Sequence, residues 1–339
     1  MRTLIFGAGA IGGYLGGILT AADADVTLVA RGSQYEALSD KGVVLEGARI
    51  GRLAPIRVRV CRPGEEKGGY DVVFVGLKAH QIAENAAHLA RILAPGGMLL
   101  FPQNGIPWWY FEKVDSPLRG TRLPSLDPGG IIANTFPIDA VVGAVTYKPA
   151  ELLAPGHIRL ADQPSDRIVI GELDNKITPR LRAIKALFEP AGWPVTPTDD
   201  IRAFKWRKLL SNAVFNPLGA ITQSSALQLV KFPATRRLAL AMIEEVSAVA
   251  ASVGVVPDMK PKDMIEYTEK RVEIPSSTLQ DVRAGRTMEL DAIDNAVIDI
   301  ARLTGVPTPN LERVVACANM LNRRIIEDHW AFAPAVVNR

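Results

Sequence analysis

Short apolar runs alternate with helical stretches in the first part of the chain. The apolar runs lie at residues 3–6, 25–30, 71–78 and 96–105. Buried strands that alternate with helices predict a parallel sheet connected by right-handed crossovers. In such a sheet the functional groups are expected at the carboxyl ends of the strands. Lys78 and Asn104 both fall at such ends.

From about Ala140 the strands become shorter. Three of them, at residues 140–147, 156–161 and 166–173, are expected to extend the same sheet. A helix is expected over residues 179–191. Residues 193–200, which include prolines and aspartates, are interpreted as a linker.

After Ile201 the strand pattern fades and long helical periods take over. Gly254 and Gly305 each follow an apolar periodic run, as residues that end a helix do. The pattern therefore predicts two domains: an α/β domain over residues 1–198 and an all-helical domain over residues 199–339.

Composition and charge exclude several classes of protein. A chain of 339 residues that is 48% hydrophobic is long enough for two domains and too apolar for disorder. The net charge of +3 comes without a basic tract, so no nucleic-acid partner is expected. No uncharged apolar run reaches about 18 residues, so no membrane span is expected. The N-terminus has the outline of a signal peptide, but its glycine spacing indicates retained structure.

The cysteines and histidines indicate neither a disulfide nor a metal site. Cys61 and Cys317 lie in unrelated contexts without a metal-binding spacing. The four histidines are scattered along the chain, so no metal is expected. A reducing, cytoplasmic location is the expectation.

Residues 7–12 read GAGAIG between a predicted strand and a predicted helix. The first glycine permits a tight turn, the second lets a pyrophosphate approach the backbone, and the third lets the helix pack on the sheet. The helix N-terminus adds free N–H groups and partial positive charge. The pattern predicts a Rossmann-type dinucleotide site, and a glycine-rich turn without a ligand is the alternative. The residues of this glycine loop are Gly7, Ala8, Gly9, Ala10, Ile11 and Gly12.

The residue that closes the second strand indicates which dinucleotide binds. An aspartate or glutamate there would accept the ribose 2′-hydroxyl group. This chain has Arg31 instead, followed closely by Ser33. Arg31 can form a bidentate contact with a 2′-phosphate, and Ser33 can add a hydrogen bond. We therefore expect NADP(H) as the cofactor, with a solvated surface arginine as the alternative.

The stretch FKWRKLLSNAVFNPLGA combines a polar stripe with an apolar helix. Lys208, Asn212 and Asn216 are spaced by four residues and so share one helical face. Asparagine is a mediocre helix former, so two at this spacing indicate hydrogen bonding to a ligand, with an ordinary exposed stripe as the alternative. Pro217 disfavours helix at Asn216, so a kink or a helix end is expected there.

A second segment, PSSTLQDVRAGRTMELDAID, also has the character of a site. Ser277 and Gln280 fit a capping box, which alone could explain the serine. Glu289 is expected early in the next helix, where the helix dipole favours a carboxylate. A structural and a functional interpretation stay open for both Ser277 and Glu289.

Together these features resemble the ketopantoate reductase family. The matching stretches are the glycine loop, Arg31, GLKAHQ with Lys78, QNG with Asn104, WRKLLSNAVFNP and PSSTLQDVRAGRTMELD. They follow the order of the family and cover nearly the whole chain. The last two are fairly specific, whereas the glycine loop alone is not. The resemblance implies an N-terminal Rossmann domain, a C-terminal all-helical domain, and a site in the cleft.

The resemblance also implies an activity, the NADPH-dependent reduction of 2-dehydropantoate to (R)-pantoate on the way to pantothenate and coenzyme A. Lys208 would donate the proton, and Asn104 would bridge cofactor and substrate. A lysine ammonium, with a reference pKa of about 10.4, is charged at neutral pH and can stabilise and then protonate the oxygen of the ketone. A homodimer through the helical domain is a further family-level expectation.

The remaining roles are implied by the resemblance in the same way. Asn212, Asn216 and Ser277 would hold the carboxylate and hydroxyl groups of the substrate. Lys78 and Glu289 would contact the cofactor near the nicotinamide.

The chain departs from the family between residues 106 and 140, where the family usually has a much shorter connection. This segment carries Trp108, Trp109 and Tyr110, called the aromatic trio below. We expect it to fold partly over the cleft and exclude water, with packing as a short helix against the sheet as the alternative. Near Ala226, an asparagine that contacts substrate in the family has no counterpart.

Three functions are therefore compatible with the sequence. The first is ketopantoate reduction. The second is a paralogous NADPH-dependent reductase of another, bulkier 2-oxoacid. The third is a non-catalytic NADP-binding sensor or scaffold, against which the set of Lys208, Asn212 and Glu289 argues.

Overall fold

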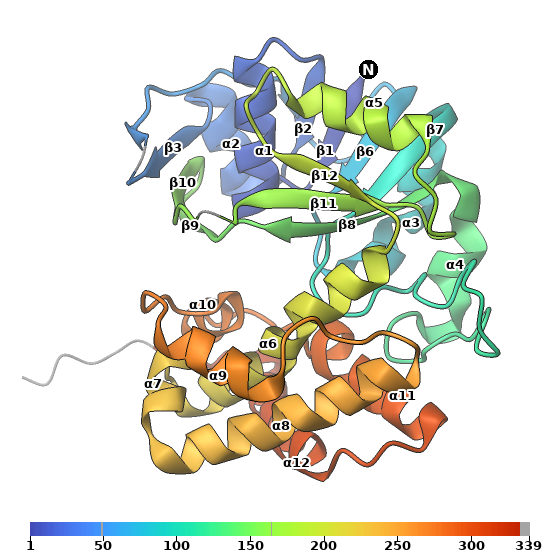
Figure 1. The fold of residues 1–339 in the computed structure, drawn as a ribbon. Helices are drawn as coiled ribbons and strands as arrows, with labels where there is room; N and C mark the ends of the chain where they lie inside the picture. Colours follow the sequence, from blue (N-terminus) through green and yellow to red (C-terminus); the bar gives the residue numbers. More distant parts are fainter. Residues whose placement is uncertain (49, 164, 333–339) are drawn as a thin grey trace, which may run out of the picture. The chain divides into compact units, whose positions relative to one another are not determined.

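The computed structural model describes residues 1–48, 50–163 and 165–332. The chain forms two compact units (Figure 1). The first, called the α/β unit, comprises Met1–Gln103, Trp108–Thr121 and Gly129–Ile201. The second, called the helical unit, comprises Asn104–Pro107, Arg122–Pro128 and Arg202–Arg339. Residues 104–140 join β7 to β8 and are called the long connection below. Two parts of it, residues 104–107 and 122–128, belong to the helical unit, which a single boundary near residue 198 does not describe.

The α/β unit is built on an eight-stranded sheet in the order β12-β11-β8-β7-β6-β1-β2-β5. The run of strands from β8 through β7, β6, β1 and β2 to β5 is parallel throughout, which confirms the expected parallel sheet. Strand β11 runs antiparallel to β8. The strand bounds are Thr3–Phe6 (β1), Val26–Val29 (β2), Val60–Cys61 (β5), Tyr70–Val75 (β6), Leu93–Phe101 (β7), Val141–Tyr147 (β8), Arg167–Gly171 (β11) and Val195–Thr198 (β12).

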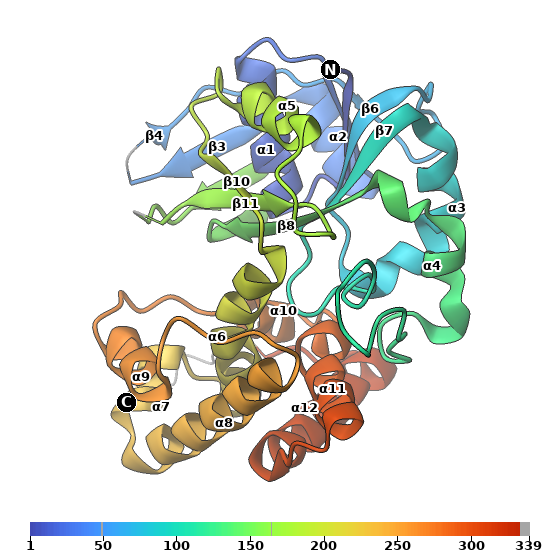
Figure 2. The same ribbon diagram turned by 45° about the vertical axis from the view of Figure 1, so that its right-hand side comes forward.

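A second, four-stranded sheet in the order β4-β3-β10-β9 packs beside helix α1 (Figure 2). Its strands are Val44–Gly47 (β3), Gly51–Arg52 (β4), Ala150–Ala154 (β9) and His157–Leu160 (β10). The expectation that residues 156–161 extend the main sheet is therefore wrong. Strand β10 pairs with β3 and β9 instead, because the short turn at Gly156 folds it back on β9.

The segment interpreted as a linker contains strand β12, which pairs in parallel with β11. The linker interpretation was wrong because Pro197 argued against a strand. Proline cannot donate a ladder hydrogen bond, so strands tolerate it at the edge of a sheet. Strand β12 is such an edge strand, and Pro197 is compatible with this position.

Short helices complete the α/β unit. Helix α1 follows β1 directly, and α5 contacts β12. The helix bounds are Ala10–Ala21 (α1), Gly32–Asp40 (α2), Ile82–Ile92 (α3), Ile131–Thr135 (α4) and Pro179–Phe188 (α5).

The aromatic trio belongs to the core of the α/β unit. Trp109 and Tyr110 are buried. A Cβ atom on Gly143 of β8 would lie 2.7 Å from the ring of Trp109. The ring of Trp108 packs edge-on against Phe101 of β7, with 5.8 Å between centroids. The expectation of a lid is therefore wrong for the trio. Large aromatic side chains bury more apolar area when they pack against the sheet than when they cover an open site. The alternative describes them better, although they lie in turns and not in a helix.

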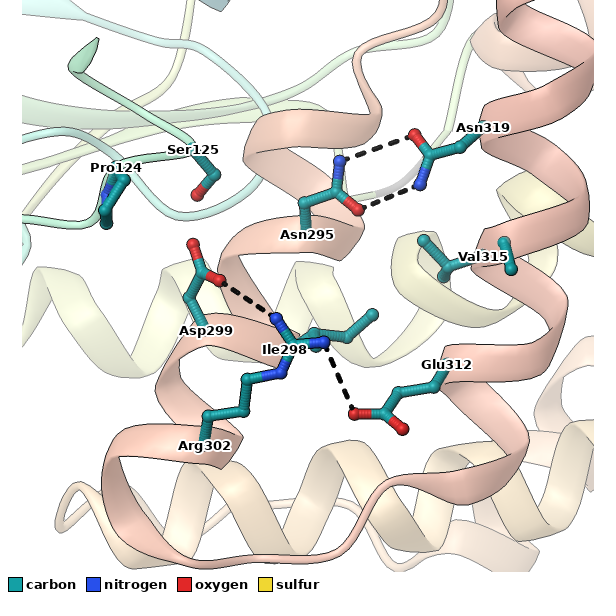
Figure 3. A pocket seen from close by; sticks show the side chains of 10 residues that line it. Pro124, Ser125, Asn295, Ile298, Asp299, Arg302, Glu312, Val315 and Asn319 are labelled. Carbon is teal, nitrogen blue, oxygen red and sulfur yellow. Dashed lines mark hydrogen bonds and ion pairs between the residues drawn. The ribbon is translucent and has the colours of Figure 1, made fainter.

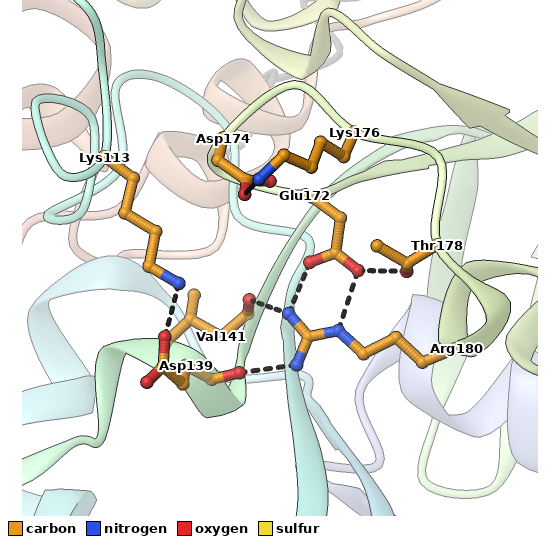
Figure 4. Close-up of polar contacts among 8 residues, drawn as sticks. All are labelled: Lys113, Asp139, Val141, Glu172, Asp174, Lys176, Thr178 and Arg180. Atoms are coloured by element: carbon orange, nitrogen blue, oxygen red, sulfur yellow. Dashed lines mark hydrogen bonds and ion pairs between the residues drawn. The ribbon is translucent and has the colours of Figure 1, made fainter.

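A polar cluster fastens the end of the long connection to the sheet (Figure 4). Arg180 of α5 forms a bidentate contact with the buried Glu172 and donates to the carbonyl oxygens of Asp139 and Val141. Lys113 adds an ion pair to Asp139 at 2.5 Å. Bidentate arginine–carboxylate pairs are among the stronger and more directional contacts, so this end of the connection has a defined conformation.

The helical unit contains the long helices that the periodicity predicted. Gly305 ends α11 with a left-handed backbone, φ 72°, and Gly254 follows α8 with φ 82°, which confirms both as residues that end a helix. No helix in the described part of the chain is long and apolar enough to cross a membrane. The bounds are Ile201–Thr222 (α6), Ala226–Lys231 (α7), Pro233–Ser252 (α8), Pro261–Glu269 (α9), Ser277–Arg283 (α10), Asp291–Asn295 (π-helical turn η4), Ala296–Thr304 (α11) and Pro309–Asp328 (α12).

Candidate functional site

The glycine loop connects β1 to α1 in a conformation that requires two of its glycines. Gly7 has φ +105°, and a Cβ atom there would lie 2.8 Å from the carbonyl oxygen of Gly76. A Cβ atom on Gly12 would lie 2.0 Å from the carbonyl oxygen of Gly7. Gly9 differs, because a Cβ atom there would meet nothing within 4 Å. Gly9 therefore borders open space, as the approach of a pyrophosphate to the backbone needs.

The N-terminus of α1 supplies the electrostatics for an anion. Gly9 is the N-cap residue, and the first turn, which includes Ala10 and Ile11, carries no acidic side chain. The first N–H groups of a helix have no partner within it and carry partial positive charge. Ala8 is buried behind the loop. These residues fit the pyrophosphate of a dinucleotide.

Arg31 lies where β2 ends and α2 begins. Its backbone is extended and its side chain is exposed, as is that of Ser33. An exposed guanidinium at this position is open to a 2′-phosphate, but exposure equally suits a solvated surface arginine. The role of Arg31 therefore stays a prediction.

Gln34 is a residue of this region that the sequence interpretation missed. Its amide nitrogen donates to the carbonyl oxygen of Ala8 at 2.6 Å. Its amide oxygen accepts from the N–H of Gly156 at 2.9 Å. One side chain on α2 thus connects the glycine loop to the turn between β9 and β10. The only sequence signal was its place three residues after Arg31, which does not reveal a contact with Gly156.

The carboxyl end of β6 is held by Gln103, a second missed residue. Its amide nitrogen donates to the carbonyl oxygens of Val75 and Leu77, at 2.7 and 3.0 Å. Lys78 follows this strand end, half-buried, and its backbone N–H donates to the side chain of Gln81 at 3.1 Å. The structure therefore places Lys78 at the edge of the sheet where the sequence pattern predicted it.

Asn104 lies in the helical unit, although it follows β7 directly. The neighbouring Ile106 donates its N–H to the carbonyl oxygen of Ala292 at 2.7 Å. Gly105, with φ +81°, packs so closely that a Cβ atom would lie 2.1 Å from the same oxygen. Asn104 is thus held near the helical segment that begins after Glu289. The π-helical turn η4 occurs in this segment, and such turns are frequent at functional sites.

The polar ladder lies on one uninterrupted helix. Of the two alternatives expected at Asn216, a kink or a helix end, the helix end is wrong, because α6 continues past Pro217 to Thr222. The residues around Pro217 are buried, so tertiary packing outweighs the local preference. Lys208 and Asn212 are half-buried. Asn216 is buried, and its amide nitrogen has no hydrogen-bond partner within the described residues.

An unpaired buried amide costs about 1–3 kcal/mol. Several other buried polar atoms of the described residues are unpaired as well, so the role of Asn216 as a substrate contact stays a prediction.

The surroundings of Lys208 lower the pKa of its ammonium group. Burial lowers the pKa of Lys208 to about 8, and the attraction to Glu289 opposes this decrease. Glu289 directly precedes the first helical residue, Leu290, and its carbonyl oxygen accepts from the N–H of Ile293. The structure therefore brings the predicted lysine and glutamate into one electrostatic cluster within the helical unit.

The capping box predicted at Ser277 is wrong by one residue. Ser276 is the N-cap residue of α10, and its hydroxyl accepts from the N–H of Leu279 at 3.1 Å. The side chain of Gln280 donates to the carbonyl oxygen of Pro275 instead of closing a box. Two adjacent serines made the register ambiguous. Ser277 is exposed and has no capping role.

Lys205 is the third missed residue, and it extends the polar ladder by one turn. It is 3% exposed and lies three residues before Lys208 on α6. Burial lowers the pKa of Lys205 to about 7, repulsion from Lys208 adds to the decrease, and Glu289 opposes it. The spacing of three, four and four residues from Lys205 to Asn216 was the sequence signal that could have identified it.

A separate hollow of about 510 Å³ lies among α11, α12 and the segment Arg122–Pro128 (Figure 3). None of the predicted site residues lines it. Arg302 pairs there with Asp299 and Glu312, and Asn295 and Asn319 exchange amide hydrogen bonds. These side chains satisfy one another, whereas the hydroxyl group of Ser125, which also lines the hollow, has no hydrogen-bond partner within the described residues.

Comparisons with known proteins agree with the fold. Residues 3–175 match the family model of ketopantoate reductase PanE/ApbA, and residues 200–322 match the model of its C-terminal domain. A 2-dehydropantoate 2-reductase of Mesorhizobium japonicum is 38% identical over 95% of this chain and 98% of the relative. A crystal structure from Ralstonia solanacearum is 31% identical, with a TM-score of 0.88 over 96% of this chain and 98% of that one.

A structure of D-mandelate dehydrogenase with NADH and anilino(oxo)acetate shares the fold, with a TM-score of 0.81 at 18% identity. It covers 96% of this chain and 99% of its own. Fold and comparisons together place the chain among the NAD(P)-dependent oxidoreductases that act on 2-oxoacids. The chain belongs to the ketopantoate reductase family.

Proposed function

We propose that this protein reduces 2-dehydropantoate to (R)-pantoate with NADPH, a step toward pantothenate and coenzyme A. The observation that carries the proposal is the cluster of Lys208, Glu289 and the polar face of α6 in one unit. The name of the relative at 38% identity supports the same reaction. The cytoplasm is the proposed location, because both free cysteines fit a reducing compartment.

The proposed proton donor is Lys208. With a pKa of about 8, its ammonium is mostly charged at neutral pH and yet releases a proton more readily than an exposed lysine. A charged donor near the ketone oxygen stabilises the negative charge that develops there and then protonates it. NADPH, when bound, supplies the hydride for the carbonyl carbon.

The proposed substrate contacts follow the polar face of α6. Asn212 and Asn216 offer amide groups that can bind the carboxylate and hydroxyl groups of a 2-oxoacid, and the unpaired amide of Asn216 is the stronger candidate. Ser277 is exposed and free of the capping role, so its hydroxyl is a further candidate. Asn104 and Lys78 are proposed to act near the nicotinamide. A homodimer is proposed on family grounds only.

The proposed cofactor preference depends on Arg31. Loss of a charge-assisted bidentate contact costs about 1.5–3 kcal/mol, or roughly ten- to a hundredfold in affinity. We expect Arg31→Ala to weaken NADPH binding by this factor and to leave NADH binding almost unchanged, as measured by fluorescence titration. Arg237→Ala, an exposed arginine on α8, is the matched control. Equal losses for both cofactors would show that Arg31 does not recognise the phosphate.

A second candidate function is reduction of another 2-oxoacid. Residues 104–107 and 122–128 of the long connection are part of the helical unit that carries Lys208, so this connection can shape the surroundings of a different substrate. Initial rates of NADPH oxidation with a panel of 2-oxoacids distinguish the candidates. A kcat/KM for 2-dehydropantoate at least tenfold above every other member supports the proposal. A bulkier preferred substrate supports the second candidate, and binding of NADPH without oxidation of any member would indicate a sensor.

A further inference from the structure

Both backbone groups of the buried Ala8 in the glycine loop are held by hydrogen bonds. Its N–H donates to the carbonyl oxygen of Val29, the last residue of β2, at 3.1 Å. Its carbonyl oxygen accepts from the side-chain amide of Gln34 at 2.6 Å. This carbonyl group lies before α1, where Gly9 accepts the hydrogen bond from the N–H of Gly13. A buried carbonyl oxygen needs a partner, and Gln34 supplies one from a neighbouring helix.

The amide oxygen of Gln34 is anchored to the turn between β9 and β10. It accepts from the N–H of Gly156 at 2.9 Å. The carbonyl oxygen of Gly156 in turn accepts from the N–H of Val44 in β3 at 2.8 Å. Because both partners of the amide are backbone groups, one an acceptor and one a donor, the orientation of the Gln34 amide is defined. The side chain cannot rotate without losing a hydrogen bond at each end.

The sheet that carries this turn also packs tightly on α1. A Cβ atom on Gly13 would lie 2.7 Å from the Cδ1 atom of Ile158 in β10. A Cβ atom on Gly17 would lie 2.7 Å from the Cγ1 atom of Val43. Such close packing resists displacement of the helix against the sheet. Gln34 therefore connects the glycine loop to a support that is itself fixed against α1.

The hydrogen bond from Gln34 fixes the orientation of the peptide group that joins Ala8 to Gly9. This peptide is trans, so its carbonyl oxygen and its N–H point to opposite sides. Glycine adopts many backbone conformations, so Gly9 does not hold the peptide in place by itself. A flip of the peptide would exchange the N–H for an oxygen beside the open space at Gly9, and an oxygen repels an anion.

We propose that Gln34 is a positioning residue for the pyrophosphate of the cofactor: by holding the carbonyl group of Ala8, it keeps the glycine loop in the conformation that accepts the anion. This inference rests on the proposed function only in so far as the loop binds a nicotinamide dinucleotide. NADPH and NADH share the pyrophosphate, so Gln34 supports the binding of both. Arg31, by contrast, is proposed to recognise the 2′-phosphate of NADPH alone.

Substitution of Gln34 by methionine keeps the length of the side chain and removes both of its hydrogen bonds. In Gln34→Met, the dissociation constants of NADPH and NADH, measured by fluorescence titration, should both rise by roughly three- to tenfold, the effect expected when loss of one neutral hydrogen bond depopulates the binding conformation. At saturating NADPH, kcat and the KM for the 2-oxoacid should stay within about twofold of wild type, because only cofactor binding is weakened.

Gln228→Met is the matched control. The amide oxygen of Gln228, on α7, accepts from the backbone N–H of Ser225 at 2.9 Å, so this substitution also removes a bond between a glutamine and the backbone. Gln228 has no part in the glycine loop, and both dissociation constants should stay as in the wild-type protein.

Gln34→Glu separates the two hydrogen bonds of the side chain. Its carboxylate still accepts from Gly156 but has no proton to donate to Ala8. In about 0.5 M salt, where repulsion between the carboxylate and the cofactor is largely screened, this variant should bind both cofactors as weakly as Gln34→Met. Wild-type affinity of Gln34→Glu would overturn the inference, because the bond to Ala8 would then be dispensable.

The remaining outcomes also decide the question. Unchanged affinity for both cofactors in a folded Gln34→Met protein, as judged by far-UV circular dichroism, contradicts a positioning role. A loss for NADPH alone shows that Gln34 acts through Arg31 and not through the loop, which also overturns the inference. If Gln34→Met does not fold, Gln34→Glu, which retains the bond to Gly156, provides the test. If the wild-type protein binds NADPH but reduces no 2-oxoacid, the proposed function fails while the titrations still test Gln34.

Discussion

The α/β unit and the helical unit each bury lysine, and they compensate its charge differently. Lys148 in the α/β unit lies between two carboxylates, with its Nζ atom 2.8 Å from Asp162 and 2.7 Å from Asp166. In the helical unit, Lys205 and Lys208 both experience the attraction of Glu289, which lies on a different segment. Lys148 thus has two carboxylates at hydrogen-bond distance, whereas the two lysines of α6 repel each other and burial lowers the pKa of both.

The difference between the two clusters suggests different roles: the charge of Lys148 stabilises the fold, whereas the charge of the lysines on α6 is available for proton transfer. Lys148 has carboxylate partners at hydrogen-bond distance, and its ammonium also lies about 6 Å from the rings of Tyr14 and Trp193. These contacts hold the ammonium group of Lys148 in one place, so its role is structural. Burial lowers the pKa of both lysines of α6, and groups with perturbed pKa values concentrate at functional sites.

The largest expected effect is on activity, at Lys208. Lys208→Ala should lower kcat by roughly 10²–10⁴, because a positioned general acid contributes about this factor. Binding of NADPH, measured by titration, should persist, and the exposed Lys231→Ala should behave as wild type. The wild-type rate should decline above about pH 8, where the folded Lys208 loses its proton, and not near the ordinary pKa of lysine. A Lys208→Ala protein with nearly full activity would show that the lysine cluster of the helical unit has no catalytic role.

At Lys148 the expected effect is on stability. Lys148→Met leaves two carboxylates without their buried cation, and such a loss costs about 3–5 kcal/mol. Urea unfolding should show this decrease in the free energy of unfolding, while the pH dependence of kcat/KM in the folded protein stays that of wild type. Lys176→Met is the control, because its ion pair with Asp174 is on the surface and little change is expected. If Lys148→Met shifts the pH profile instead, the distinction between the two clusters does not hold.

The smallest effect concerns Asp294, a buried carboxyl group with no partner for either oxygen among the described residues. Burial raises the pKa of Asp294 well above its usual value, so the folded protein prefers the protonated form. The stability that this group contributes is complete at low pH and is lost as the pH rises toward the folded pKa. Asp294→Asn should therefore stabilise the protein by about 1–2 kcal/mol at pH 7, with the gain vanishing toward pH 4. Urea unfolding at both pH values measures this, and a gain that is independent of pH would contradict the assignment.

Much of the fold could be predicted because periodicity and glycine spacing are local properties. The strand–glycine loop–helix unit at the N-terminus and the helix ends at Gly254 and Gly305 needed no information from distant residues. Strand β12 and the place of β10 in the second sheet were missed because both depend on pairing with distant residues. Whether a short apolar run lies at the edge of one sheet or in another sheet depends on its pairing partners, which the run itself does not specify.

The sequence by itself determined the glycine loop, since the spacing from Gly7 to Gly12 is recognisable, whereas the expected roles of Lys208 and Glu289 came from the resemblance to the family. Only the tertiary structure decided what these residues experience. The depression of the lysine pKa values comes from burial and from Glu289, which lies 81 positions beyond Lys208 in the chain. The bridge from Gln34 to Gly156 likewise joins residues 122 positions apart. Desolvation and Coulomb interactions act through space, so their strength depends on how the chain folds and not on the order of its residues.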